Sequence, residues 1–179
     1  GQEVFGATIG IIGMGGVGQQ VARRAIGFDM KVLYNNRTEI PEIAAKLGAS
    51  YVSLNELLSQ SDFVTLNVPM TPDTRHLIGQ NELALMKPTA ILVNAARGGV
   101  LDHDALLEAL RDSTIWAAAL DVTDPEPLPR GHPLLTLSNI VIAPHLGSAT
   151  RKTRIGMVQR TIDNLIAGLT GSKMPSQVA

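Results

Sequence analysis

Short apolar runs recur along the chain, and segments with helical periodicity separate nearly all of them. The runs predict strands at Thr8–Ile12, Lys31–Tyr34, Asp62–Val68, Ala90–Asn94, Ile115–Asp121 and Ile140–Ala143. The segments between and after them predict helices at Val17–Gly27, Glu42–Leu47, Leu54–Ser59, Asn81–Met86, His103–Arg111 and Ser148–Gly168. This alternation predicts a doubly wound α/β fold in which a parallel sheet lies between two layers of helices.

Composition agrees with a folded chain and excludes several kinds of chemistry. The 179 residues are 45% hydrophobic and 17% charged, against roughly 25% charged residues in an average soluble domain. We expect one domain over residues 1–179, with a core at about 6–170. Cysteine is absent, which excludes disulfides and thiolate chemistry, and the four histidines are scattered, so no metal site is expected.

Charge and hydropathy also limit the partners. The net charge of −1 has no basic block behind it, so we expect no nucleic-acid partner. No apolar run approaches the roughly 18 residues that span a bilayer, and the start of the chain lacks the pattern of a signal peptide. The expectation is a cytoplasmic protein without a membrane partner.

The first predicted strand runs directly into a glycine-rich loop, Gly13-Met14-Gly15-Gly16-Val17-Gly18, which a helix follows. In a G-x-G-x-x-G motif the glycines permit a tight turn, the approach of a pyrophosphate and close packing of helix on strand. The helix N-terminus offers free N–H groups and partial positive charge to the phosphates. The motif predicts a Rossmann-type dinucleotide site at Gly13, Gly15, Gly16, Val17 and Gly18, where Met14 either contacts the cofactor or packs beneath it.

The turn after the second predicted strand indicates which dinucleotide binds. A carboxylate usually stands there and accepts the hydroxyls of the adenine ribose, but this chain has Asn35-Asn36-Arg37-Thr38. Arg37 supplies a cation, and its neighbours supply donors, for a 2′-phosphate that a carboxylate would repel. NADP(H) is therefore favoured and NAD(H) remains possible, because Arg37 could also be an ordinary solvated loop residue.

Three polar residues follow the ends of the later predicted strands, where ligands bind in open α/β sheets. Arg97 has the fork geometry that suits a substrate carboxylate. His145 suits proton exchange near neutral pH, and a carboxylate such as Glu126 would favour its imidazolium form. Together they suggest acid–base chemistry on a 2-oxo or 2-hydroxy acid, although each also has an ordinary interpretation as a loop or cap residue.

The chain resembles the nucleotide-binding domain of the D-isomer-specific 2-hydroxyacid dehydrogenase family. The matching segments are GIIGMGGVG, SDFVTLNVPMTPDTRHLIG, ILVNAARGGVLDHDAL, AALDVTDPEPLP and NIVIAPHLGSAT, in the family's order. The resemblance implies that Arg97 holds the substrate carboxylate, His145 donates the proton in reduction and Glu126 orients it. It also implies a set of further cofactor contacts: Val68, Pro69, Thr74, Ala95, Ala96, Asp121, His145 and Gly147.

Within the family, YNNRT and PHLGSAT most resemble the branch that reduces glyoxylate- or hydroxypyruvate-type 2-oxo acids to D-2-hydroxy acids. The family's architecture implies that a substrate lobe lies outside this chain and that the full-length protein is a homodimer. This chain would then carry the catalytic residues but only half of the cleft. Two alternatives stay open. One is a dinucleotide-sensing, corepressor-like module without turnover, and the other is an NAD-dependent relative such as phosphoglycerate dehydrogenase.

Overall fold

The computed structural model describes residues 1–177 and contains two compact units. Gly1–Pro144 form the first unit, and the second begins at His145. The expectation of one dinucleotide-binding domain over residues 1–179 stays a prediction, and its last two positions lie outside the described residues.

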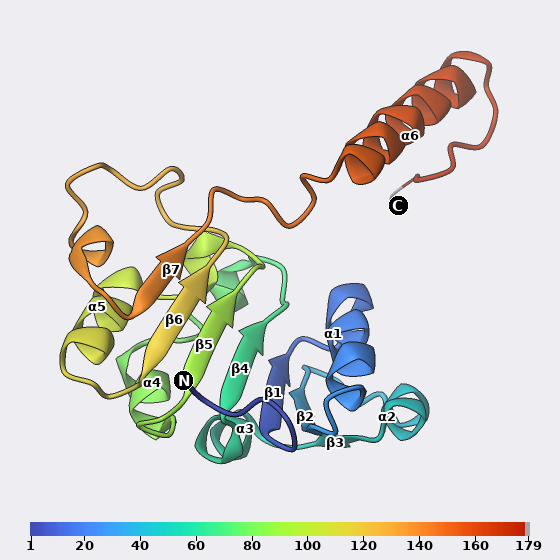
Figure 1. Cartoon of the computed structure of the whole chain (residues 1–179). Helices are drawn as coiled ribbons and strands as arrows, with labels where there is room; N and C mark the ends of the chain where they lie inside the picture. The colour runs from blue at the N-terminus through green and yellow to red at the C-terminus, as the bar shows by residue number, and fades with distance from the viewer. Residues whose placement is uncertain (178–179) are drawn as a thin grey trace. The chain divides into compact units, whose positions relative to one another are not determined.

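A seven-stranded parallel sheet organises the first unit. Its strands, in chain order, are β1 (Thr8–Ile12), β2 (Lys31–Asn35), β3 (Ala49–Tyr51), β4 (Phe63–Leu66), β5 (Ile91–Asn94), β6 (Ala117–Leu120) and β7 (Ile140–Ile142). They lie side by side in the order β3-β2-β1-β4-β5-β6-β7 (Figure 1), and every pairing is parallel. The winding reverses between β1 and β4, so the predicted Rossmann-type, doubly wound fold is confirmed.

Helices cover the sheet from two sides and bury two separate apolar clusters. The helices of this unit are α1 (Gly16–Ile26), α2 (Pro41–Leu47), α3 (Leu54–Gln60), α4 (Gln80–Leu85) and α5 (His103–Arg111), with 3₁₀ turns η1 (Pro72–Thr74), η2 (Gly98–Val100) and η3 (Pro133–Thr136). One cluster joins β1 and β2 to α1 and α2 through residues such as Ile11, Tyr34 and Ala22. The larger cluster joins β4, β5 and β6 to α3, α4 and α5. Because neighbouring residues of a strand point to opposite faces, both faces of the sheet are buried against helices.

Local signals in the sequence set several helix ends. Ser53 and Glu56 form a reciprocal capping box at the start of α3. Asp102 accepts hydrogen bonds from the backbone N–H groups of Asp104 and Ala105 at the start of α5. Pro41 is the first residue of α2, and Gly48 ends that helix in the left-handed conformation with φ of 59°.

One strand of the sheet was not predicted. Ala49–Tyr51 forms the short edge strand β3, which pairs with Val32–Tyr34 of β2. Its residues are half-buried or exposed, so it lacks the apolar run by which the inner strands are recognised. Hydrogen bonding to β2, a non-local interaction, makes it a strand.

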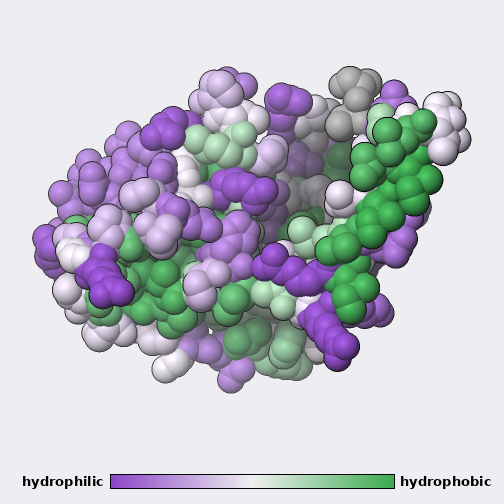
Figure 2. Space-filling view, turned by 90° about the horizontal axis from the view of Figure 1, so that it is seen from above, coloured by the Kyte–Doolittle hydropathy of each residue, from purple (hydrophilic) through white to green (hydrophobic). Residues whose placement is uncertain are grey.

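The second unit contains α6 (Arg151–Leu169). Its N-cap is Thr150, whose hydroxyl oxygen accepts a hydrogen bond from Thr153 N. Every residue of α6 is exposed or half-buried. Figure 2 shows a continuous apolar strip along this helix, and its residues recur one to four positions apart: Ile155, Val158, Ile162, Leu165, Ile166 and Leu169. Among residues 1–177, no helix is both long and apolar enough to cross a membrane.

Asp62 links the start of β1 to the segment after α4. Its carboxylate accepts hydrogen bonds from Thr8 N at 2.9 Å and from Lys87 Nζ at 2.8 Å. Burial alone would raise the pKa of Asp62, but the hydrogen bonds from Lys87 and Thr8, together with the charge of Lys87, lower it below its ordinary value. The ionised carboxylate therefore stabilises the fold.

We expect Asp62→Asn to lower the free energy of unfolding by about 1 kcal/mol at neutral pH. Because the pKa of Asp62 is lower in the folded chain, its contribution is present above the unfolded pKa, near pH 4, and disappears as pH falls through the folded value. Urea denaturation at neutral and acidic pH measures this. Glu39→Gln, at an exposed position, is the control, and a difference from wild type that stays constant into acid would contradict the assignment.

Candidate functional site

The glycine-rich loop connects β1 to α1 and is shaped by contacts with two other strands. Gly13 has φ of +96°, which glycine adopts without strain, and a Cβ there would lie 2.8 Å from the Asn67 backbone and from Val68 Cγ1. Gly13 N donates to Asn35 O at 2.9 Å. Gly18 packs so closely on Gly13 O that a Cβ would collide with it. These two glycines allow the close packing that the motif predicts.

The other two glycines face open space. Gly15 is the N-cap of α1 and Gly16 is its first residue, and no heavy atom lies within 4 Å of a Cβ built on either. Gly15 offers no side-chain cap, and the first turn of α1 has no acidic residue. The N-terminus of this 11-residue helix therefore presents N–H groups and positive potential to an open surface.

A cavity of about 490 Å³ lies beside this helix N-terminus, where the winding of the sheet reverses. Its walls come from the start of α1, from the segment after β4 and from the segment after β5. They consist of Gly16, Val17, Asn67, Val68, Pro69, Met70, Ala95, Ala96 and Arg97. The fold thus brings many of the predicted site residues to one place, as expected for the crevice of an open α/β sheet. Asn67 and Met70 also line the cavity, although the sequence did not predict them as site residues.

The turn after β2 is bonded to the glycine loop. Asn36 Oδ1 accepts a hydrogen bond from Met14 N at 2.7 Å, and Tyr51 Oη donates to Asn36 O at 3.2 Å. Asn35 Nδ2 donates to Val52 O at 2.8 Å. Met14 itself is buried in the cluster with α1 and α2, so its side chain packs in the core.

Arg37 and Thr38 project from this fixed turn into solvent. Both are exposed. Within the described part of the chain, the guanidinium of Arg37 makes no hydrogen bond or ion pair. The charge next to the glycine loop is therefore available to an external anion.

Asn94 holds the turn that carries Arg97, and sequence reasoning missed it. It is the last residue of β5, its side chain is 0% exposed, its Nδ2 donates to Arg97 O at 3.0 Å and its Oδ1 accepts from Ala96 N at 3.0 Å. The signal that could have identified it is a polar residue at the carboxyl end of a buried strand. Arg97 is exposed, and its Nη1 donates to Ala96 O at 2.7 Å.

Thr74, predicted as a cofactor contact, also organises its own loop. Its hydroxyl donates to Pro69 O at 2.7 Å and accepts from Thr71 N at 2.8 Å. These bonds close the segment that holds Val68 and Pro69 against the cavity. Thr74 does not itself appear in the cavity wall that the described residues form.

Asp121 and Glu126 lie in the loop after β6. Asp121 N donates to Asn94 O, so the loop begins beside the Arg97 turn. Glu126 is exposed, and its Oε2 accepts a 3.4 Å hydrogen bond from Thr123 N. Arg97, Asp121 and Glu126 thus follow adjacent strands of one sheet.

His145 and Gly147 belong to the second unit. His145 is exposed and has φ of 55°, a backbone conformation that residues other than glycine seldom adopt and that recurs at functional sites. The predicted pairing of His145 with Glu126 joins residues of different units and stays a prediction.

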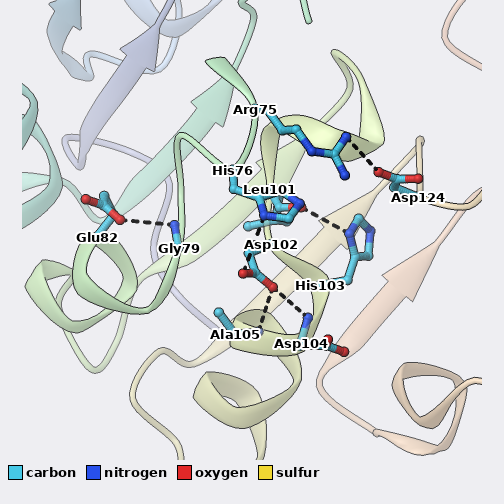
Figure 3. A network of polar contacts seen from close by, with 10 residues as sticks. All are labelled: Arg75, His76, Gly79, Glu82, Leu101, Asp102, His103, Asp104, Ala105 and Asp124. Carbon is cyan, nitrogen blue, oxygen red and sulfur yellow. Dashed lines mark hydrogen bonds and ion pairs between the residues drawn. The ribbon is translucent and has the colours of Figure 1, made fainter. Parts of the chain in front are cut away.

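Two of the remaining histidines, His76 and His103, lie at the start of α5 and outside the cavity wall (Figure 3). His76 Nδ1 lies 3.7 Å from Asp102 Oδ2, and Arg75 Nη1 lies 3.8 Å from Asp124 Oδ2. His103 is buried with Nδ1 3.1 Å from Leu101 O, and burial lowers its pKa. Among residues 1–177, no group of three or more His, Asp or Glu side chains could hold a metal ion.

Comparison with known proteins identifies the family. Residues 1–147 match the family model of the D-isomer specific 2-hydroxyacid dehydrogenase, NAD binding domain. The chain belongs to this family. Its glycine loop, switch-point cavity and Arg97 turn are thus parts of a dehydrogenase nucleotide-binding domain.

Individual members of the family are similar over nearly the whole chain. A glyoxylate reductase of Thermococcus onnurineus (strain NA1) is 52% identical over 178 residues, which are 99% of this chain and 53% of that protein. Glyoxylate/hydroxypyruvate reductase B of Enterobacter agglomerans is 50% identical over 172 residues, 96% of this chain and 53% of that protein. The crystal structure of a glyoxylate reductase from Paecilomyes thermophila superposes with a TM-score of 0.92 at 40% identity, covering 99% of this chain and 54% of that one. The chain spans about half the length of these dehydrogenases.

Asn94→Ala should destabilise the first unit by about 2–3 kcal/mol, because it removes two hydrogen bonds and leaves a cavity in a fully buried position. Asn55→Ala, on the exposed face of α3, is the matched control and should change the unfolding free energy by less than about 0.5 kcal/mol. Chemical denaturation followed by circular dichroism measures both. Equal midpoints for the two variants would show that the Arg97 turn does not depend on Asn94.

Proposed function

We propose that this chain is the cofactor-binding half of an NADP(H)-preferring reductase that converts glyoxylate- or hydroxypyruvate-type 2-oxo acids to D-2-hydroxy acids. The observation that supports the proposal most strongly is the cavity at the point where the winding of the sheet reverses (the switch-point cavity). It has the N-terminus of α1 at one wall and Arg97 at another. Such a cavity matches a dinucleotide whose phosphates lie at the helix N-terminus, with the carboxylate of a separate substrate beside Arg97. The similarity to glyoxylate reductases over 99% of the chain supports this substrate class.

The residues present fit a dinucleotide. Open space lies over Gly15 and Gly16, so the pyrophosphate can approach the N–H groups of α1 without meeting a side chain. Val17, 63% exposed, offers an apolar surface beside them. Val68, Pro69, Ala95 and Ala96 provide small or apolar walls along the rest of the cavity.

The preference for NADP(H) rests on the turn after β2. The side-chain oxygen of Asn36 already accepts a hydrogen bond from Met14 N, whereas Arg37 and Thr38 next to it are exposed. A guanidinium without a partner among the described residues suits a 2′-phosphate, because a charge-assisted bidentate pair forms without breaking an existing one.

In this proposal, three residues have separate roles where the substrate reacts. The bound nicotinamide supplies the hydride. Arg97 holds the substrate carboxylate and orients the carbonyl, His145 donates the proton to the carbonyl oxygen, and Glu126 favours the protonated imidazole. Asp121 and Gly147 are further cofactor contacts in this proposal. A substrate lobe outside this chain, a homodimer and a cytoplasmic location remain predictions of the same proposal.

The cofactor preference is tested by titrating NADPH and NADH against wild type and Arg37→Ala with fluorescence detection. NADPH affinity should fall by about 1–3 kcal/mol while NADH affinity stays nearly constant, because only the 2′-phosphate contact is lost. Arg111→Ala, at the far end of α5, is the control. Equal losses for both cofactors would exclude a 2′-phosphate contact.

The catalytic roles are tested in the full-length protein with glyoxylate and hydroxypyruvate. Arg97→Ala should raise KM sharply, and His145→Gln should lower kcat by roughly 10²–10⁴ with little change in cofactor affinity. Glu126→Gln should move the basic limb of the reductive pH profile toward acid, because reduction needs the protonated imidazole and the carboxylate stabilises its charge. An alkaline shift, or full activity without a shift, would remove Glu126 from the mechanism. Wild-type protein that binds NADPH but reduces neither acid would favour a sensing role.

A further inference from the structure

The loops that carry Arg97 and Glu126 pack against each other backbone to backbone. Gly98 is buried directly beside the Thr123 carbonyl group, so that a Cβ on Gly98 would collide with its carbon and oxygen and lie 2.6 Å from Asp124 N. Backbone atoms cannot rotate away as the end of a long side chain can. Glycine is therefore required at position 98 for this approach.

Hydrogen bonds connect Thr123 to Glu126 and to the loop that carries it. Thr123 is 8% exposed, its hydroxyl donates to Pro125 O at 2.9 Å, and its N–H donates to Glu126 Oε2 at 3.4 Å. The residue that packs against Gly98 thus also holds the loop and carboxylate of Glu126. Because Gly98 follows Arg97 in the chain, a displacement at this contact would move both functional side chains.

An ion pair lies beside the contact between Gly98 and Thr123. Arg75 Nη1 lies 3.8 Å from Asp124 Oδ2, and Figure 3 shows Arg75 reaching toward Asp124. A Cβ on Gly99 would lie 3.0 Å from the same Asp124 oxygen. That neighbour is the end of a flexible side chain, so position 99 has more room to adjust than position 98.

We propose that Gly98 is a positioning residue, which sets the distance and orientation between Arg97 and Glu126 by admitting the Thr123 backbone. This rests on the function proposed above, in which the two residues act on one substrate. Misplacement of a reacting group by about 1 Å can cost 10²-fold in rate. The packing of Gly98 against the Thr123 backbone therefore affects catalysis, although Gly98 contacts neither substrate nor cofactor.

The test compares Gly98→Ala with Gly131→Ala in the full-length protein. Gly131 lies in the same loop, is exposed and has no atom within 4 Å of a Cβ. Gly98→Ala should lower kcat at least about tenfold, raise the KM for glyoxylate several-fold and move the basic limb of the pH profile toward acid, while the Kd for NADPH changes less than about threefold. Gly131→Ala should match wild type. A folded Gly98→Ala protein with wild-type kcat, KM and pH profile would overturn the proposal.

Thr123→Val keeps the test decisive if Gly98→Ala does not fold. It preserves the volume of the side chain and removes the bond to Pro125 O, so it should give a smaller loss of kcat and the same acid shift. Unchanged kinetics in a folded Thr123→Val protein would then overturn the proposal.

A readout without turnover separates this proposal from the proposed function. Hydrogen exchange of the peptide covering residues 121–131 should be faster than wild type in Gly98→Ala or Thr123→Val, and unchanged in Gly131→Ala outside the mutated position. A wild-type protein that reduces neither acid would end the proposed function, even if the exchange result holds. Unchanged exchange in folded Gly98→Ala protein would end the positioning role, even if wild type is active.

Discussion

Parallel pairing brings the carboxyl ends of all seven strands to one edge of the sheet, and the rest of the site depends on this constraint. The reversal of winding between β1 and β4 sends the following helices to opposite faces, so the loops after β1, β4 and β5 surround a crevice. Segments far apart in sequence thereby share one cavity. The first helix contributes its N-terminus, and β5 contributes the turn that ends at Arg97.

Polar side chains then fix the loops that the parallel sheet brings together. Asn94 bonds to two backbone groups of the Arg97 turn, and Asn36 bonds to the glycine loop. Each replaces water as the partner of a backbone group that would otherwise lose a hydrogen bond on folding. The loops at this edge are therefore held by specific bonds, which suits a site whose groups must keep their relative positions.

Features that depend on neighbouring residues could be predicted from the sequence, and those that depend on distant contacts could not. The glycine loop and the inner strands have local patterns, and the structure confirms them. The caps at Ser53 and Asp102 also depend only on residues near them in the chain. The edge strand β3 and the role of Thr123 have no such pattern, because their partners are set by the folded sheet. A polar residue at the end of a buried strand marks Asn94, but its two backbone partners appear only in the fold. His145 illustrates the remaining limit, since its proposed partner lies in the other unit.

The bond between Asn36 and Met14 N has a consequence for how cofactor preference can change. The accepting atom is the side-chain oxygen Oδ1, which an aspartate at the same position also possesses. Exchange of the amide for a carboxylate therefore alters the charge of the turn while it retains the acceptor that holds the glycine loop. The polarity of the turn and the shape of the phosphate loop are separable properties in this fold, and selection could vary the first without rebuilding the second.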